Sequence, residues 1–153
     1  MSTTADTSPA STFSLRPAVE ADYLRVFALL QQLEGYSPEQ EAFDKNFALL
    51  LHDEATTLLL VSTDSEGSVV GYALTTITPL LHVNGSSAQL QELAVDVARQ
   101  GEGIGTALVE EVERLCRERE VRQLTVPSRR SADFYERIGY RSTADFLKRT
   151  LDD

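Results

Sequence analysis

Glycines alternate with other residues in the segment Gln100–Leu108, which reads QGEGIGTAL. Gly101, Gly103 and Gly105 have no side chains, so the backbone can turn sharply there and another molecule can approach it closely. An apolar-rich run precedes the segment and a strongly amphipathic run follows it, which predicts a strand, a tight turn and a helix. Unpaired N–H groups and the macrodipole make the N-terminus of such a helix favourable for phosphate. The segment therefore predicts a site for a phosphate-bearing cofactor.

Two other phosphate-binding loops fit this segment poorly. A Walker loop ends in Gly-Lys-Ser/Thr, whereas Gly105 is followed by Thr106 without a lysine, which argues against ATP or GTP hydrolysis. A dinucleotide fingerprint has a glycine where this chain has Thr106, and it normally follows the first strand of a repeated β-α-β series. Glu120 stands about where a ribose-binding acid would be, so a nicotinamide-binding protein stays open as an alternative.

Hydrophobic periodicity and turn residues predict the elements that position the turn. Their order is β-α-α-β-β-β-α-β-α-β, an α/β domain with a mixed, mostly antiparallel central sheet and helices on both faces. The unit over 89–126 is expected to be a parallel β-α-β crossover. Gly71, inside one strand, indicates a bulge or a close approach. We predict strands over 13–16, 56–63, 68–78, 89–95, 121–126 and 146–151, and helices over 20–33, from Pro38 with Ser37 as cap, over 104–119 and over 131–138.

Size and composition indicate one soluble globular domain. The 153 residues are enough for a buried core, and 42% hydrophobic and 25% charged residues are ordinary fractions. We expect residues 1–11 to be a flexible tail and residues 12–153 to form the domain. No apolar run approaches the ~18–20 residues that cross a bilayer. Since the first residues also lack the features of a secretory signal, we expect a cytoplasmic protein.

Charge and single residues exclude several classes of partner. The net charge of −10 argues against nucleic acid or an anionic membrane and weakly favours cationic ligands. Cys116 is the one cysteine, so an internal disulfide is excluded and a reducing compartment fits. His52 and His82 have no partners at metal-ligand spacing, so we expect no metal site.

Two motifs, in the right order along the chain, carry a resemblance to a known family. The first, Gln100–Gly105, has the pattern Gln/Arg-x-x-Gly-x-Gly/Ala, and the second, Phe134–Tyr140, has the pattern Phe-Tyr-x-x-x-Gly-Phe/Tyr. Both are motifs of the GNAT superfamily of N-acetyltransferases, which this chain resembles over roughly residues 13–150. The resemblance implies an enzyme that moves an acetyl group from acetyl-CoA directly to a primary amine, without a metal.

The resemblance also implies where acetyl-CoA binds. In the family, the strand before the turn splays from its neighbour and the pantetheine arm lies in the gap. Backbone groups of Leu93, Ala94 and Val95 would then contact pantetheine. The diphosphate would be bound by the turn, whose residues are Gln100, Gly101, Glu102, Gly103, Ile104, Gly105 and Thr106.

The segment after the predicted strand at 121–126 departs from the family pattern. Ser128 stands where many relatives have an asparagine that contacts the cofactor, and a serine hydroxyl is shorter. Arg129 and Arg130 follow, and either contact with the phosphates or exposure to solvent is open for them.

Two residues are assigned to the chemistry. The resemblance places Tyr135 beside the cofactor's sulfur, and a phenol with a pKa near ~10 is protonated at pH 7, so Tyr135 is the expected proton donor to the departing thiolate. Glu92 is the expected base for the amine proton, although some relatives carry the glutamate one position earlier, at the position of Gln91. Adjacent strand residues point to opposite faces, so this offset matters unless a bulge corrects it.

The sequence does not identify the acceptor. A small-molecule or peptide amine is expected, bound by residues of about 20–52 and by the loop near 79–88. The resemblance also allows a homodimer. Because Glu92 is offset and Ser128 is unusual, a catalytically weak or inactive CoA-binding sensor or association module stays open as the alternative.

Overall fold

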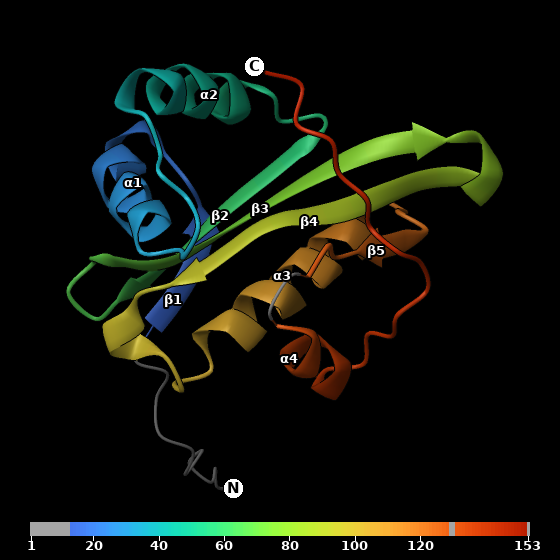
Figure 1. Cartoon of the computed structure of the whole chain (residues 1–153). Coiled ribbons are helices and arrows are strands. Elements are labelled where there is room, and N and C mark those ends of the chain that lie inside the picture. Colours follow the sequence, from blue (N-terminus) through green and yellow to red (C-terminus); the bar gives the residue numbers. More distant parts are fainter. Residues whose placement is uncertain (1–12, 129–130, 153) are drawn as a thin grey trace, which may run out of the picture.

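A sheet forms the centre of the protein, and the computed structural model describes residues 13–128 and 131–152 (Figure 1). In this part of the chain, five strands lie in the order β1-β2-β3-β4-β5. The strands β1 (Phe13–Pro17), β2 (Thr57–Asp64), β3 (Val69–Leu80) and β4 (Gly85–Val95) are antiparallel neighbours, whereas β5 (Gln123–Thr125) is parallel to β4. The tail expected at residues 1–11 and the residues Arg129 and Arg130 lie outside the described residues.

Helices cover both faces of the sheet. Figure 1 shows α1 (Tyr23–Gln31) and α2 (Gln40–His52) on one face, and α3 (Ile104–Glu118) and α4 (Ala132–Arg137) on the other. Three short 3-10 helices complete the described elements: η1 (Glu20–Asp22), η2 (Leu81–Val83) and η3 (Val97–Arg99). The mixed α/β fold and the parallel crossover from β4 through α3 to β5 are thereby confirmed. Within the described residues, no helix has the length and apolarity needed to cross a membrane.

The sheet separates two hydrophobic cores. In β2, Leu58 and Leu60 pack on the side of α3, whereas Leu59 and Val61 pack on the side of α1 and α2. Both faces are covered, so both sets of side chains are buried, which explains why this strand is buried along almost its whole length and has a continuous apolar run, Leu58–Val61, rather than an alternating pattern. The helix α3 presents Ile104, Leu108, Val109, Val112 and Cys116 to its core.

One predicted strand was wrong, and several boundaries differ from the prediction. The strand expected from residue 89 begins at Gly85, so most of the loop expected near 79–88 belongs to β3, η2 and β4. The segment 146–151 forms no strand, and its large apolar side chains, Phe146, Leu147 and Leu151, are exposed. A short run that contains apolar residues becomes a strand only where a neighbouring edge accepts its hydrogen bonds. The strand expected over 121–126 contracts to the bounds of β5. Helix α2 begins two residues later than predicted, with Glu39 rather than Ser37 at the N-cap position.

Gly71 lies at both a bulge and a close approach, as its sequence context predicted. Ser62 pairs with Gly71 but Thr63 pairs with Val69, so Val70 is the extra residue in β3. A Cβ atom on Gly71 would lie 3.1 Å from Ile104 Cγ2, 3.2 Å from the Ala94 carbonyl oxygen and 3.3 Å from Leu108 Cδ1. This position therefore sets how closely α3 packs on the sheet.

Gly71→Ala should lower the free energy of unfolding by about 1–2 kcal/mol. Overpacking of this kind costs about 1–3 kcal/mol, which exceeds the gain of about 0.4–1 kcal/mol from a less flexible unfolded chain. Urea unfolding followed by circular dichroism measures the difference. Equal stability of the two proteins would mean that α3 shifts freely on the sheet, contrary to this packing.

Candidate active site

The strands β4 and β5 separate soon after they meet. Their parallel pairing covers only Ser87–Gln89 of β4 and Gln123–Thr125 of β5. From Leu90 to Val95, β4 pairs with β3 on one side, and no described strand pairs with its other edge. Such an edge leaves N–H and C=O groups available to a ligand. The gap thus provides backbone partners in the middle of the sheet.

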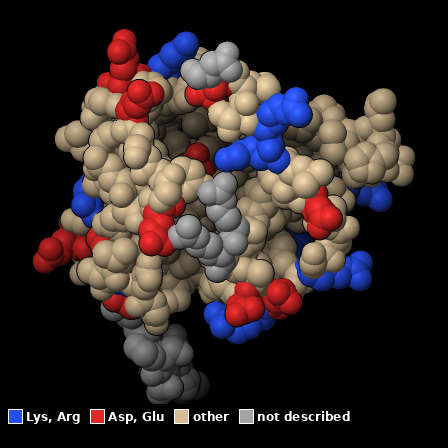
Figure 2. Space-filling model, viewed as in Figure 1, with Lys and Arg blue, Asp and Glu red and all other residues tan. Residues whose placement is uncertain are grey.

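A cavity of about 600 Å³ opens between the separated strands. We call it the gap cavity. Its walls include Leu90–Leu93 of β4, Val126–Ser128 after β5, Tyr135 of α4 and residues from the end of α1 and the α1–α2 connection. Figure 2 shows this face of the molecule hollowed, with acidic side-chain atoms inside the hollow. The cavity joins a tyrosine from one side of the sheet to carboxylates from the other.

A second cavity, of about 550 Å³, continues along the glycine turn. We call it the turn cavity, and it shares Leu33, Leu93 and Ser131 with the gap cavity. Most of the residues that the sequence suggested for cofactor binding line it. They are Leu93, Ala94, Val95, Gln100, Gly101, Gly103, Ile104, Gly105 and Thr106.

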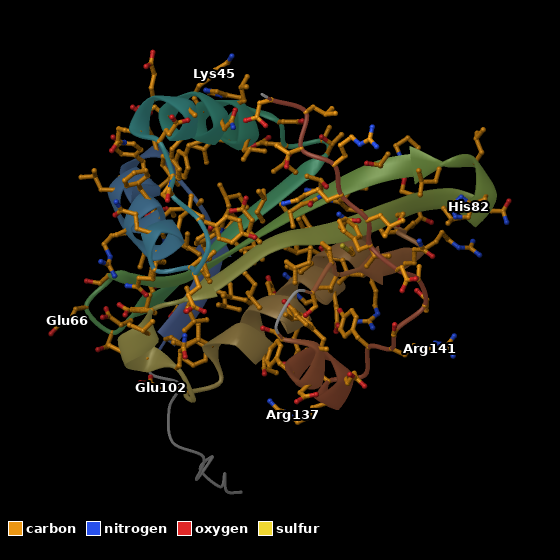
Figure 3. All side chains as sticks on the ribbon, in the orientation of Figure 1. Lys45, Glu66, His82, Glu102, Arg137 and Arg141 are labelled. Carbon is orange, nitrogen blue, oxygen red and sulfur yellow. The ribbon has the colours of Figure 1, made fainter. Side chains whose placement is uncertain are left out.

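Two of the suggested cofactor residues lie elsewhere. Glu102 does not line the turn cavity, because its carboxylate accepts two hydrogen bonds from Arg99 Nε, each at 3.0 Å. Figure 3 shows Glu102 on the turn and Arg137 on α4. Ser128 lines the gap cavity, and its hydroxyl oxygen accepts a hydrogen bond of 3.1 Å from the Ser131 N–H, just before α4. Arg129 and Arg130 fall outside the described residues.

The glycine turn leaves the N-terminus of α3 open. Gly101 and Gly103 both have a φ of 86°, in the left-handed region that favours glycine. Gly103 takes the N-cap position, where a residue without a side chain offers no capping hydrogen bond, and the N–H of Ala107 donates to its carbonyl oxygen at 3.0 Å. The N–H groups of the first helical turn have no partner within the helix, and together with the helix dipole they favour an anion.

Tyr135 lies on the wall of the gap cavity and is only 8% exposed. The rings of Phe134 and Tyr140 hold its ring edge-to-face, with centroid distances of 4.9 and 5.9 Å. Burial raises the pKa of Tyr135 to about 12, because the charged phenolate loses hydration. The phenol is therefore protonated throughout the neutral range and is available as a hydrogen-bond or proton donor.

A bulge decides where Glu92 points. Leu74 pairs with Glu92 but Thr75 pairs with Leu90, so Gln91 is the extra residue in β4. Leu90 is buried on the α3 side of the sheet and Ala94 on the α1 and α2 side, which shows that the alternation inverts at the bulge. Both Gln91 and Glu92 line the gap cavity. The one-residue offset in the sequence therefore does not turn Glu92 away from the cavity.

Tyr72 is a neighbour of Glu92 that sequence reasoning missed. Its hydroxyl donates a hydrogen bond of 2.8 Å to Glu92 Oε1, and its side chain is 1% exposed. Burial, followed by the negative charge of Glu92, raises the pKa of Tyr72, so the hydroxyl stays protonated and keeps donating. Only the register of β3 against β4 brings the two residues together, and no local pattern in the sequence could have indicated it.

The remaining candidates for metal chemistry lie apart. His82 is at the far end of the β3–β4 pair from the glycine turn (Figure 3). Among the described residues, no group of three or more His, Cys, Asp and Glu side chains is placed to hold a metal ion.

The sequence and the fold were compared with those of known proteins. A sequence model described as the acetyltransferase (GNAT) family matches residues 23–140. No curated protein sequence gives a significant match. Among solved structures, an acetyltransferase of Trypanosoma brucei is 25% identical with a TM-score of 0.78, and the match covers 91% of this chain and 99% of that one.

Two further structures agree in fold. A transcriptional regulator from Bacillus halodurans is 23% identical with a TM-score of 0.83, over 91% of this chain and 99% of that one. A glucosamine-6-phosphate N-acetyltransferase from Arabidopsis thaliana is 21% identical with a TM-score of 0.79, over 92% of this chain and 99% of that one.

Proposed function

Because the chain belongs to the acetyltransferase (GNAT) family, we propose that it transfers an acetyl group from acetyl-CoA directly to a primary amine. One observation supports this most strongly: the open N-terminus of α3 and the buried Tyr135 lie on two adjoining cavities. The N-terminus of α3 can bind a diphosphate through backbone N–H groups, and Tyr135 can donate a proton to a thiolate.

Each part of acetyl-CoA has a proposed binding surface. The N–H groups of the turn from Gln100 to Thr106 would bind the diphosphate, with the side chain of Glu102 turned toward Arg99. The open edge of β4 at Leu93, Ala94 and Val95 would bind the pantetheine arm through backbone hydrogen bonds. Ser128 would contact acetyl-CoA from the opposite wall of the gap cavity.

The proposed reaction needs two proton transfers. The thioester of acetyl-CoA supplies the acetyl group: a C–N bond to the amine forms and the C–S bond breaks. Glu92 would accept the amine proton, directly or through a water molecule, and Tyr135 would protonate the departing thiolate. An N–H group of β4 near Val95 would stabilise the negative charge that develops on the carbonyl oxygen.

The proton donor requires a site that favours the transfer. The pKa of Tyr135, about 12, lies above the ~8.5 of a thiol like that of cysteine, which by itself disfavours the transfer. The same burial would raise the basicity of a thiolate in the cavity, because it removes water from both anions. Burial therefore keeps Tyr135 protonated and also narrows the difference between its pKa and that of the thiol.

The direct test is turnover. Purified protein mixed with acetyl-CoA and a panel of primary amines should release free thiol at a rate that depends on the amine. Calorimetry should show binding of coenzyme A. Binding without turnover for any amine would favour a CoA-binding module instead, and no heat of binding at millimolar coenzyme A would end the proposal.

Glu92→Gln should lower kcat/KM for the amine at pH 7 by about 100-fold, the lower end of what a general base contributes. An alkyl ammonium has a pKa near ~10.4, so a variant without a base depends on the small neutral fraction of the amine. That fraction rises about tenfold per pH unit, so the loss should shrink steadily between about pH 7 and pH 9.

Glu66→Gln provides the matched control. Glu66 lies in the turn between β2 and β3, and Figure 3 shows it at the edge of the molecule. The same chemical change there should leave the rates unaltered. If Glu92→Gln lost activity equally at every pH, Glu92 would have a structural role rather than that of a base.

A further inference from the structure

A third cavity, of about 430 Å³, lies between the sheet and the two N-terminal helices. We call it the helix cavity. Most of its walls are apolar, and most of these apolar side chains belong to the core on this side of the sheet. They include Val26 of α1, Phe43, Phe47 and Leu50 of α2, and Leu59 and Leu74 of the sheet. The volume is in the range that holds a small organic ligand.

Glu92 lies where the helix cavity meets the gap cavity. The two cavities share Leu30, Pro38 and Glu92. The carboxylate is held by the Tyr72 hydroxyl, which comes from the floor of the helix cavity. A ligand that fills the helix cavity would thus have its inner end at a carboxylate, beside the cavity that Tyr135 lines.

Aromatic rings make the helix side of this cavity suitable for apolar groups. The rings of Phe43 and Phe47 stack with their centroids 5.5 Å apart and an interplanar angle of 25°. The ring of Phe27 packs edge-on against Phe43, with a centroid distance of 5.0 Å. Such surfaces favour aliphatic and aromatic carbon. A hydroxyl or a second ammonium group placed among them would lose its hydration without gaining hydrogen bonds.

We propose that the acceptor is a primary amine on an apolar alkyl or aryl body, with the amine at Glu92 and the body in the helix cavity. This inference rests on the proposed acetyl transfer and adds the class of the acceptor to it. Charge complementarity orients the ligand, because Glu92 lies where this cavity meets the gap cavity and most of the remaining wall is apolar, with Glu39 and Asn46 as its other polar residues besides Tyr72. Polyhydroxylated amines and long polyamines are poor candidates on the same grounds.

A homologous series of straight-chain amines, from ethylamine to octylamine, tests this class. The ammonium group stays the same along the series, so only the buried apolar surface changes. Each buried methylene should raise kcat/KM about fourfold, or about 60-fold from propylamine to hexylamine, until the cavity is full. Phenylethylamine should be accepted, and spermidine and glucosamine should be acetylated far more slowly.

Two matched variants locate the binding surface. Ala42 and Ala48 are both exposed residues of α2, but Ala42 lines the helix cavity whereas Ala48 lines a separate groove beside η1. Leucine is nearly as good a helix former as alanine, so neither Ala42→Leu nor Ala48→Leu should unfold the helix. Ala42→Leu should reduce turnover of hexylamine at least tenfold while sparing ethylamine, and Ala48→Leu should leave the series unchanged.

The possible outcomes separate this inference from the proposed function. Three results would contradict an apolar acceptor without contradicting acetyl transfer. They are a kcat/KM that does not change with the chain length of the amine, a preference for spermidine, and a dependence on chain length that Ala42→Leu does not alter. If no amine were acetylated, the acetyl-transfer proposal would fail. Calorimetry would then still decide the cavity's preference, since hexylamine should bind more tightly than propylamine and Ala42→Leu should remove the difference.

Discussion

Tyr135→Phe should lower kcat at least 100-fold while the KM for acetyl-CoA changes by no more than about twofold. Proposed general acids of this kind contribute about 10²–10⁴-fold to the rate, and the substitution removes only the hydroxyl. The ring remains packed against Phe134 and Tyr140, so the thermal midpoint should change little. Steady-state kinetics at saturating amine measures the effect.

The pH dependence gives a second check on the same variant. The pKa of Tyr135 is raised to about 12, so the donor is protonated at every pH below about 11. The ratio of wild-type to variant rates should then be constant between about pH 7 and pH 10. A ratio that fell toward one in that range would mean that the phenol loses its proton there, contrary to its burial.

Tyr140→Phe serves as the control. Tyr140 belongs to the same aromatic group and its hydroxyl donates a hydrogen bond of 2.6 Å to Glu113 Oε2, but it lines neither the gap cavity nor the turn cavity. Loss of that bond should cost about 1–2 kcal/mol of stability with little change in kcat. Equal losses of kcat in both variants would show that the aromatic group acts through packing alone.

Gly103→Ala should raise the dissociation constant for coenzyme A by at least tenfold. Gly103 has a φ of 86° at the N-cap of α3, where an L-residue with a Cβ is strained by about 1–2 kcal/mol. The strained turn would relax by rotating its peptide groups, and the N–H groups that we propose bind the diphosphate would lose their common direction. Isothermal titration calorimetry measures the change.

Gly67→Ala separates strain from binding. Gly67 has a φ of 85° and, like Gly103, has no atom within 4 Å of an added Cβ, but it lies in the turn between β2 and β3. Both variants should lose a similar amount of stability in urea unfolding. Only Gly103→Ala should weaken the binding of coenzyme A. Equal affinities for coenzyme A in the two variants would show that the glycine turn does not bind the diphosphate.

Local sequence was sufficient for the glycine turn and the helix that follows it. Glycines at 101 and 103 permit the left-handed backbone that the turn adopts, and the amphipathic run beyond them has one apolar face, so both features follow from short-range sterics and periodicity. The crossover from β4 to β5 was equally predictable, since a strand, a helix and a strand in succession pack in parallel.

Errors occurred where a segment depends on a distant partner. The run at 146–151 has apolar residues suited to a strand, yet a strand forms only with a free edge beside it, and sequence periodicity carries no information on that edge. The N-cap of α2 also differs from the prediction: it is Glu39, and Pro38 lies on the walls of the gap and helix cavities, outside the helix that it was predicted to begin.

The sequence by itself determined the fold class, the glycine turn at the start of α3 and the tyrosine and glutamate that we propose move protons. The tertiary structure decided how these groups meet, because the bulge at Gln91 inverts the side-chain alternation of β4 and brings Glu92 to the cavity that Tyr135 lines from α4. It also decided that Tyr72 holds Glu92 and that an apolar cavity ends at this carboxylate. Strand register and the separation of β4 from β5 are long-range properties, set by the packing of both sheet faces rather than by any local run of residues.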